Sequence, residues 1–205
     1  MTKRHVALAM TGASGAQYGL RLLECLLQSD CRVSLMISRP AQVVLGMETD
    51  LAVPGRSAEI RRFFCDRHGV GEDQLAVYGR EEWTAPVASG SAVPEAMAVC
   101  PCTTATVSAL ATGASRSLIE RAGDVVLKEQ RRLVLVVRET PFSVIHLENM
   151  LALARAGAVI LPANPGFYHR PDSVEALVDF VVARTLDHLG VPHALVRPWG
   201  ENAGP

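Results

Sequence analysis

Small and hydroxyl-bearing residues recur directly after short apolar runs of the sequence. Thr-Gly-Ala-Ser-Gly at 11–15 follows one such run, and so do Ser38 and the hydroxyl-rich stretch Cys-Thr-Thr-Ala-Thr at 102–106. Free backbone N–H groups at the start of a helix favour an anion such as phosphate, and hydroxyl groups add hydrogen bonds. The spacing matches neither a Walker A motif nor a G-x-G-x-x-G fingerprint. Two such loops on neighbouring strands predict a phosphorylated cofactor such as flavin mononucleotide (FMN).

The segments that must position these groups alternate between strand-like and helix-like patterns. Short apolar runs predict strands at 6–10, 32–38, 95–99, 133–137 and 158–161. Helical patterns lie between them at 16–28, from about 103, at 143–156 and from 173 to about 189. This alternation predicts an α/β fold with three layers, a doubly wound (Rossmann-like or flavodoxin-like) and mostly parallel sheet. Ligands of such sheets bind outside the carboxyl ends of the strands, where the hydroxyl-rich groups lie.

The length of 205 residues suits one domain, which we expect to span 1–199. Within it, the range 51–91 is the least periodic part and is rich in glycine and proline, so we interpret it as an irregular insertion of short elements. The range 200–205 is expected to form a C-terminal tail.

Charge and cysteine content exclude several classes of protein. Twenty basic and twenty-one acidic residues give a formal net charge of -1, which argues against a nucleic-acid partner. Five cysteines, an odd number without a secretory signal, argue against a disulfide framework. No apolar run approaches the roughly eighteen residues of a membrane helix, so we expect a cytoplasmic protein without a membrane partner.

Some residues are ambiguous when taken alone. Arg121, Lys128 and Arg184 have the pattern of solvated helix faces, where surface ion pairs are the usual outcome. Cys100 and Cys102 have the wrong spacing for a zinc site or for a thioredoxin-like pair. The sequence therefore predicts no metal site.

Seven motifs, in order, carry a resemblance to a known family. They are T-G-A-S-G (11–15), E-T-D (48–50), A-S-G-S (88–91), L-I-E-R-A-G-D-V-V-L-K-E (118–129), L-V-L-V-V-R-E-T-P (133–141), I-H-L-E-N-M-L (145–151) and P-G-F-Y (165–168). Together they resemble the UbiX/Pad1 family of flavin prenyltransferases, over about 6–199.

The resemblance implies an enzyme that transfers a dimethylallyl group from dimethylallyl monophosphate to N5 and C6 of reduced FMN. The product, prenylated FMN, is the cofactor of UbiD-type decarboxylases, in bacteria often one of ubiquinone biosynthesis. The resemblance further implies a homododecamer that works without a metal ion, and the sequence has no Asp-rich motif to hold magnesium.

By position, the resemblance implies FMN contacts at Gly12, Ala13, Ser14, Ser38, Thr103, Thr104, Ala105, Thr106 and Arg138. It implies proton handling by Ser14, Glu48 and Glu139, with Ser14 and Glu139 favoured. One departure is Thr103, where many members have serine after the cysteine; threonine keeps the hydroxyl group.

The same resemblance implies a clamp of cations and a phenol on the donor phosphate, which would stabilise the charge of the leaving group in place of Mg²⁺. Its members are Arg121, Lys128, Tyr168 and Arg184. Trp83 and Trp199 would form aromatic walls near the prenyl chain, and Ser89, Gly90 and Glu139 would also contact the donor.

Two other functions compete with this interpretation. The sister group of FMN-dependent cysteine decarboxylases shares fold and flavin site but has a P-A-M-N segment and a catalytic histidine. Here the corresponding segment reads Pro-Ala-Asn-Pro at 162–165. A non-enzymatic flavin carrier would need FMN but not Lys128, Tyr168 or Arg184.

Overall fold

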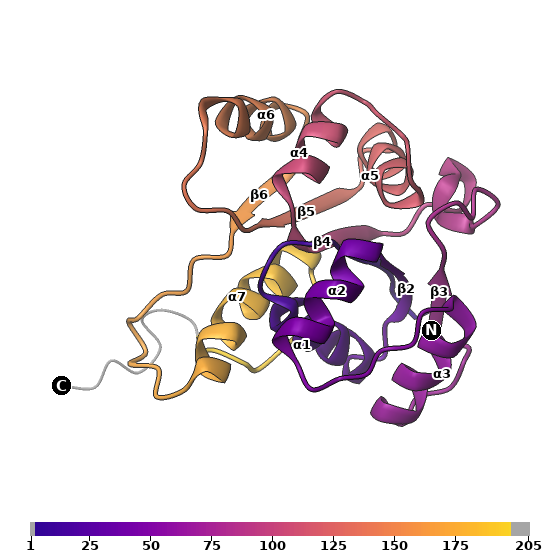
Figure 1. Cartoon of the computed structure of the whole chain (residues 1–205), viewed down its shortest axis with the longest axis vertical. Coiled ribbons are helices and arrows are strands. Elements are labelled where there is room, and N and C mark those ends of the chain that lie inside the picture. Colours follow the sequence, from indigo (N-terminus) through magenta and orange to yellow (C-terminus); the bar gives the residue numbers. More distant parts are fainter. Residues whose placement is uncertain (1–2, 198–205) are drawn as a thin grey trace.

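The computed structural model describes residues 3–197, which form a six-stranded sheet covered by helices on both faces (Figure 1). The strands are β1 (His5–Met10), β2 (Arg32–Ile37), β3 (Leu75–Tyr78), β4 (Ala96–Cys102), β5 (Arg132–Val137) and β6 (Val159–Pro162). Their order is β3-β2-β1-β4-β5-β6, and every neighbouring pair is parallel. The chain reverses its direction of winding between β1 and β4, which places a crevice at their carboxyl ends.

The helices form two layers. One layer holds α1 (Ala16–Gln28), α2 (Arg39–Glu48), α3 (Ser57–His68) and α7 (Val174–Leu189), and the other holds α4 (Thr104–Ala111), α5 (Leu118–Lys128) and α6 (Val144–Arg155). Alternation along β1 shows the division, since Val6 and Leu8 pack into the first layer and Ala7 and Ala9 into the second. The predicted three-layer, doubly wound α/β fold is confirmed.

Hydroxyl groups define where several helices begin. The side chains of Ser38, Thr103 and Ser117 each accept a hydrogen bond from a backbone N–H three residues later, as helix N-caps do. Such a bond satisfies one of the otherwise unpaired N–H groups of the first turn. The helix starts at the carboxyl edge of the sheet are therefore fixed by short polar side chains.

The structure corrects the interpretation of 51–91 as an irregular insertion of short elements. This range contains the twelve-residue helix α3 and the strand β3, which extends the sheet beside β2. The range is irregular at 51–56 and after β3, where it has two short 3-10 helices, η1 (Pro86–Ala88) and η2 (Gly90–Ala92). The strand β3 has four residues at the edge of the sheet, too few for a clear apolar pattern.

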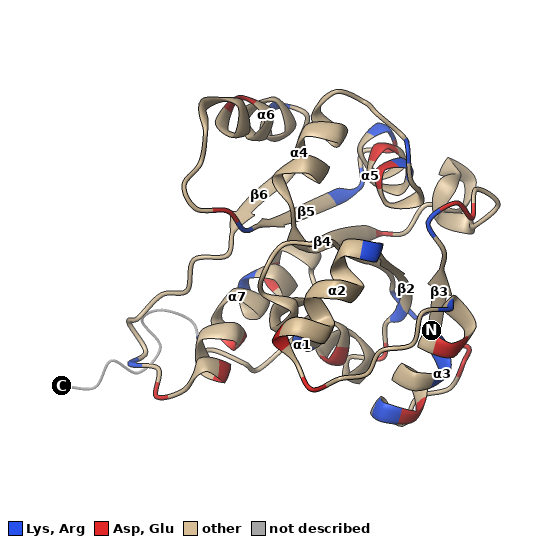
Figure 2. Ribbon diagram, viewed as in Figure 1, with Lys and Arg blue, Asp and Glu red and all other residues tan. Residues whose placement is uncertain are grey.

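Residues of both charges are spread over the helices and loops, in keeping with the near-neutral net charge (Figure 2). Within residues 3–197, no helix is both long and apolar enough to cross a membrane.

Candidate active site

The carboxyl ends of β1 and β4 are joined by one buried threonine. The Thr11 hydroxyl donates to the carbonyl oxygen of Pro101 at 2.8 Å and accepts from the backbone N–H of Thr103 at 2.9 Å. The backbone N–H of Thr11 also donates to that carbonyl, at 3.1 Å. These bonds fix the start of α4 relative to the end of β1, on the two sides of the crevice.

A pocket of about 280 Å³ lies at this crevice. The hydroxyl groups of Thr103 and Thr106 lie 2.9 Å apart at the start of α4. Further lining comes from both sides of the crevice: Thr11, Gly12, Met36, Ile37, Ser38, Arg39, Pro40, Tyr78, Gly79, Arg80, Ala105 and residues 117–120. Hydroxyl groups, a helix N-terminus and arginines fit a phosphate, and the apolar side chains fit a planar ring. The residues present therefore fit FMN.

A carboxylate occupies the start of α1. Oε2 of Glu48, the last residue of α2, accepts from the backbone N–H groups of Gly15 and Ala16 at 2.8 and 2.9 Å. Burial opposes ionisation of Glu48, but the hydrogen bonds from Ser14, Ala16 and Gly15 and the positive charge of Arg138 outweigh it. They hold the pKa of Glu48 below its usual value, so the group is a carboxylate at neutral pH.

The N–H groups of the strand–helix junction at 11–15, which the sequence predicts to attract a phosphate, thus already bind a carboxylate, and contact of this junction with FMN stays a prediction. The anion at this helix N-terminus is Glu48 itself. Gly15 has a φ of 103°, a conformation that favours glycine, and a Cβ on Gly12 would lie 2.4 Å from Cβ of Pro40. Gly12 therefore lets the loop after β1 pack closely against the start of α2, and the start of α4 remains as the candidate phosphate site.

Beside Glu48 a second hollow, of about 380 Å³, opens at the ends of β5 and β6. Its lining includes Ser14, Glu48, Arg138 and Glu139. Arg138 is exposed and Glu139 half-buried, while Oε1 of Glu139 accepts from the backbone N–H of Thr140 at 3.0 Å. Two carboxylates, a hydroxyl and a guanidinium thus lie together, a combination suited to moving protons.

A cationic cluster lies on α5. Nε of Arg121 donates to the carbonyl oxygen of Ala88 at 3.1 Å, and its Nη1 donates to Asp124 at 3.0 Å. Lys128 Nζ lies 2.5 Å from Oε1 of Glu129 and would lie 3.0 Å from a Cβ at Gly90. The segment that carries Ser89 and Gly90 is therefore held against α5.

A second cationic pocket, of about 930 Å³, lies along α7. Tyr168, Arg184, Asp187 and His193 are among its lining residues. Nη1 of Arg184 donates to Oδ2 of Asp187 at 2.5 Å. The phenol of Tyr168 and the guanidinium of Arg184 thus face one hollow.

Comparisons with known proteins identify the family. A family model described as Flavoprotein matches residues 1–186. The flavin prenyltransferase UbiX of Pseudomonas aeruginosa is 59% identical over 96% of this chain and 94% of its own length. The chain belongs to the UbiX family of flavin prenyltransferases. The predictions of the family, of an enzyme and of a flavoprotein that uses FMN are confirmed.

Two solved UbiX structures extend the likeness to the fold. AnUbiX (PadA1), in complex with FMN and dimethylallyl pyrophosphate, has a TM-score of 0.86 at 38% identity, covering 98% of this chain and 99% of its own. A dodecameric FMN-dependent UbiX-like decarboxylase from Escherichia coli O157:H7 has a TM-score of 0.83 at 36% identity, with coverage of 96% and 100%.

The residues predicted to clamp the donor phosphate lie on opposite faces of the sheet in this chain. Arg121 and Lys128 belong to the layer of α5, and Arg184 to that of α7, on the opposite face of the sheet. Each helix runs away from the carboxyl edge, and at 1.5 Å per residue Lys128 lies about 15 Å along α5 from Leu118. Within one chain these groups do not converge, because the sheet stands between them. Their convergence on one phosphate stays a prediction.

Four further residues that the resemblance singled out are Ala13, Thr104, Trp83 and Trp199. Ala13 is buried beside Gly12, and Thr104 begins α4. Trp83 lies before η1 and is 47% exposed. Trp199 and the predicted tail 200–205 lie outside the described residues.

Some lining residues of the flavin pocket escaped the sequence analysis. Arg39 follows Ser38 directly and could have been found from its position after a predicted strand. Tyr78 and Arg80 could not, because Tyr78 ends and Arg80 follows β3, the strand that the apolar pattern did not reveal.

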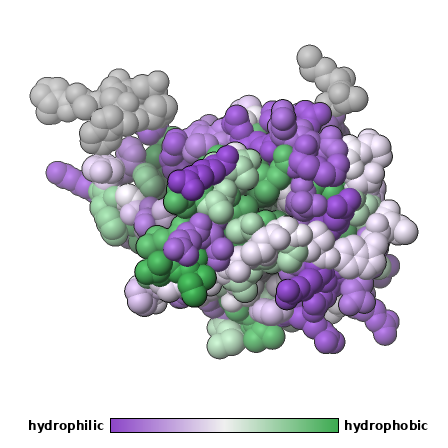
Figure 3. All heavy atoms as spheres, turned by 90° about the horizontal axis from the view of Figure 1, so that it is seen from above, coloured by the Kyte–Doolittle hydropathy of each residue, from purple (hydrophilic) through white to green (hydrophobic). Residues whose placement is uncertain are grey.

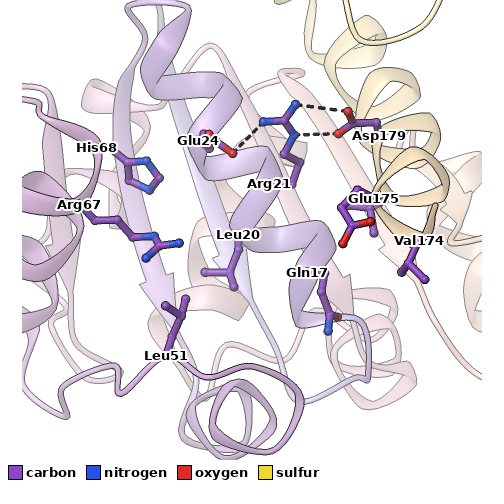
Figure 4. Close-up of a pocket in the computed structure, with 11 residues that line it drawn as sticks. Gln17, Leu20, Arg21, Glu24, Leu51, Arg67, His68, Val174, Glu175 and Asp179 are labelled. Atoms are coloured by element: carbon purple, nitrogen blue, oxygen red, sulfur yellow. Dashed lines mark hydrogen bonds and ion pairs between the residues drawn. The ribbon is translucent and has the colours of Figure 1, made fainter. Parts of the chain in front are cut away.

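Another hollow lies between α1, α3 and α7, and three of its charged side chains pair with one another (Figure 4). Arg21 donates to Asp179 through Nε at 2.7 Å and to Glu24 through Nη1 at 2.8 Å. This pairing makes the groove a structural contact between α1 and α7. Among residues 3–197, no group of three or more His, Cys, Asp or Glu side chains has the arrangement of a metal site.

Proposed function

We propose that this chain transfers a dimethylallyl group from dimethylallyl monophosphate to N5 and C6 of reduced FMN, without a metal ion. Family membership supports the reaction class. The observation that carries the proposal is the pair of hollows at the carboxyl edge of the sheet, one lined by hydroxyl and apolar groups and the other by an ionised Glu48 and the hydroxyl of Ser14. Reduced FMN supplies the nucleophilic N5 and C6 atoms; the chain's residues bind it, orient it and move protons.

The flavin half of the site lies at one edge of one chain. The start of α4, with Thr103 and Thr106, would hold the phosphate of FMN, and Ser38 would line the same pocket. Gly12 would let the ring approach the end of β1. Arg138 would reach the flavin from the neighbouring hollow.

Proton transfer would fall to the pair Ser14 and Glu48 and to Glu139. The Ser14 hydroxyl donates to Glu48, whose depressed pKa keeps the acceptor ionised. Closing the ring at C6 requires a proton to leave that carbon, and a serine that passes its own proton to a carboxylate can receive it. Glu139 lines the same hollow and would act on the donor side.

The donor half would be completed by a neighbouring copy of the chain. Cleavage of the bond between the allylic carbon and the phosphate oxygen leaves both electrons on the phosphate, so cations must surround it. Lys128 and Arg121 lie on one face of the sheet and Arg184 and Tyr168 on the other. The two groups can meet only if the α5 surface of one copy faces the α7 surface of another. Trp83 and Trp199 would enclose the prenyl chain.

The exposed face of α6 supports assembly into a homo-oligomer, which we propose to be a dodecamer. Apolar side chains reach the surface of the layer formed by α4, α5 and α6 (Figure 3). On α6, Val144, Ile145, Leu147 and Leu151 are each at least half exposed. Large exposed apolar patches mark protein interfaces. The partner would be a second copy, as in the dodecameric UbiX-like protein.

The product would pass to a UbiD-type decarboxylase, in ubiquinone biosynthesis, and we propose that the reaction takes place in the cytoplasm. This part of the proposal follows from the family alone. Deletion of the encoding gene should remove prenylated FMN from the partner decarboxylase, and loss of that cofactor would be detected by its extracted mass.

Incubation with reduced FMN and donor under anaerobic conditions tests the reaction itself. The extracted flavin should gain the mass of one prenyl unit with dimethylallyl monophosphate, and the pyrophosphate should be run beside it because AnUbiX was solved with that compound. Unchanged flavin would contradict the proposal. Oxidative decarboxylation of a cysteine-containing substrate would indicate the sister group instead.

Mixing two inactive variants tests the shared clamp. Lys128→Ala and Arg184→Ala should each abolish transfer when expressed alone. Co-expressed in equal amounts, they should restore about one quarter of the wild-type activity, since a site needs both intact groups from different copies. Activity that stays at the level of the single variants would place both groups in one chain's site.

A further inference from the structure

We propose that Asp187 is a positioning residue for Arg184, and that a hydrogen bond from His193 holds Asp187 in place. This inference rests on the proposed function, in which Arg184 contacts the donor phosphate. It concerns two residues of the α7 pocket that the sequence motifs did not single out. Both are polar, both line the hollow shared with Tyr168 and Arg184, and both contact each other.

The two oxygens of Asp187 have different partners. Oδ2 accepts from Nη1 of Arg184 at 2.5 Å, and Oδ1 accepts from Nε2 of His193 at 3.0 Å. Because the carboxylate is held at both ends, it cannot rotate without breaking a bond to one of them. The Arg184 guanidinium is thereby held by a carboxylate whose own orientation is fixed by His193.

The hydrogen bonds of His193 set its tautomer. Nδ1 accepts from the backbone N–H of Leu195 at 3.3 Å, so the neutral ring carries its hydrogen on Nε2 and donates it to Asp187. The His193 side chain is only 12% exposed, whereas Arg184 is 53% exposed. A nearly buried imidazole therefore anchors a chain of bonds that ends at an exposed cation.

The fold brings these residues together through the end of α7. Gly190 caps the helix with a φ of 67°, in the left-handed region that favours glycine, and turns the chain back along the helix. The turn places His193 against Asp187, six residues earlier.

Stability alone does not account for this arrangement. Exposed ion pairs three residues apart on a helix contribute little to folding, and Arg56–Glu59 is such a pair, 3.8 Å apart and without a third partner. Arg121, the other arginine of the proposed clamp, resembles Arg184 in this respect. Its Nη1 donates to Asp124, three residues later on α5, at 3.0 Å. Both arginines of the proposed clamp thus have a dedicated carboxylate. A guanidinium held in advance loses less rotational freedom when it binds phosphate.

The experiment compares donor binding and turnover in the full-length protein loaded with FMN. Asp187→Asn should raise KM for dimethylallyl monophosphate about tenfold, with a smaller change in kcat and unchanged FMN affinity. Asp187→Glu should recover part of the loss. His193→Gln, which keeps a donor near the position of Nε2, should behave like wild type, while His193→Ala should raise KM several-fold. The matched control Glu59→Gln breaks the isolated ion pair and should change nothing.

Calorimetric titration of the donor into protein loaded with oxidised FMN gives a second readout that needs no turnover. Asp187→Asn should weaken donor binding by the same factor as it raises KM. Equal donor affinity in wild type and Asp187→Asn would overturn the inference, and so would parallel losses of FMN and donor affinity, which indicate general misfolding. If the wild-type protein transfers no prenyl group, both the proposed function and this inference fail. If the wild-type protein does transfer one, the variants alone decide whether Asp187 positions Arg184.

Discussion

The flavin pocket and the donor clamp are built in opposite ways. The pocket is assembled from consecutive strand ends at one edge of the sheet, and its walls are locked by Thr11 within one chain. The cations of the proposed clamp belong to helices on opposite faces, and the sheet separates them. In our proposal one chain forms the cofactor site, whereas the donor site requires assembly. Damage to assembly should accordingly separate flavin binding from prenyl transfer.

Breaking the interface should have the largest effect. Ile145→Glu combined with Leu147→Glu places two charges in the apolar face of α6, so the oligomer should dissociate because buried unpaired charges are costly. Transfer should fall at least about 100-fold while FMN affinity changes less than about tenfold, as removal of charge stabilisation costs two to three orders of magnitude. Light scattering and flavin mass spectrometry provide the measurements.

Glu148→Gln, which alters an exposed charge on the same helix, serves as the control and should stay assembled and active. If the double variant dissociates yet keeps full transfer activity, the donor site is complete within one chain and the contrast between the two regions disappears.

Within the flavin half, loss of the Glu48 carboxylate should affect chemistry more than binding. Glu48→Gln keeps the shape of the side chain but removes the ionised acceptor of the Ser14 proton, so transfer should slow about 100-fold, as for loss of a general base. FMN should remain bound, since the pocket at α4 is untouched. Stopped-flow absorbance would follow ring closure, and Glu24→Gln on α1 is the control. A wild-type rate in Glu48→Gln would remove this residue from proton transfer.

A change at the start of α4 should affect FMN binding more than chemistry. Thr106→Val removes a hydroxyl at the candidate phosphate site, so FMN affinity should fall about tenfold, a loss of one hydrogen bond to a charged group. With saturating FMN, turnover should be close to wild type. Thr112→Val removes a hydroxyl at the other end of the same helix and should leave affinity unchanged. Fluorescence titration of FMN measures both; equal affinities in the two variants would move the phosphate elsewhere.

The sequence predicted five of the six strands because each is an apolar run, and it predicted the strand ends as the site because ligands of parallel sheets bind there. It did not reveal β3, whose four residues lie at the sheet edge, and therefore missed Tyr78 at its end and Arg80 after it. It could not show that Glu48 returns to the start of α1, since that contact depends on how α2 packs. It also could not show that Lys128 and Arg184 lie apart, because a local apolar pattern does not say which face of the sheet a helix covers.

The last prediction concerns the sheet that both halves of the site share. His5 is buried, its Nε2 lies 2.8 Å from Oγ of Ser34, and Nη2 of Arg32 lies 3.0 Å from its Nδ1. Burial, followed by the charge of Arg32, lowers the pKa of His5 to about 4, although Glu95 opposes the shift. The unfolded chain, with an ordinary pKa near 6.5, therefore binds more protons between these two values, and stability falls as pH falls through that window.

Between pH 7.5 and 5.0 this difference corresponds to about 2 kcal/mol of unfolding free energy. Urea denaturation at the two pH values should show that loss in the wild type and not in His5→Gln, which cannot titrate. Since the sheet carries both regions, flavin binding and transfer should decline together as the protein unfolds, unlike the separate losses expected for Glu48→Gln and Thr106→Val. An equal loss of stability in His5→Gln would assign the pH dependence to another group, such as His68, whose pKa burial also lowers.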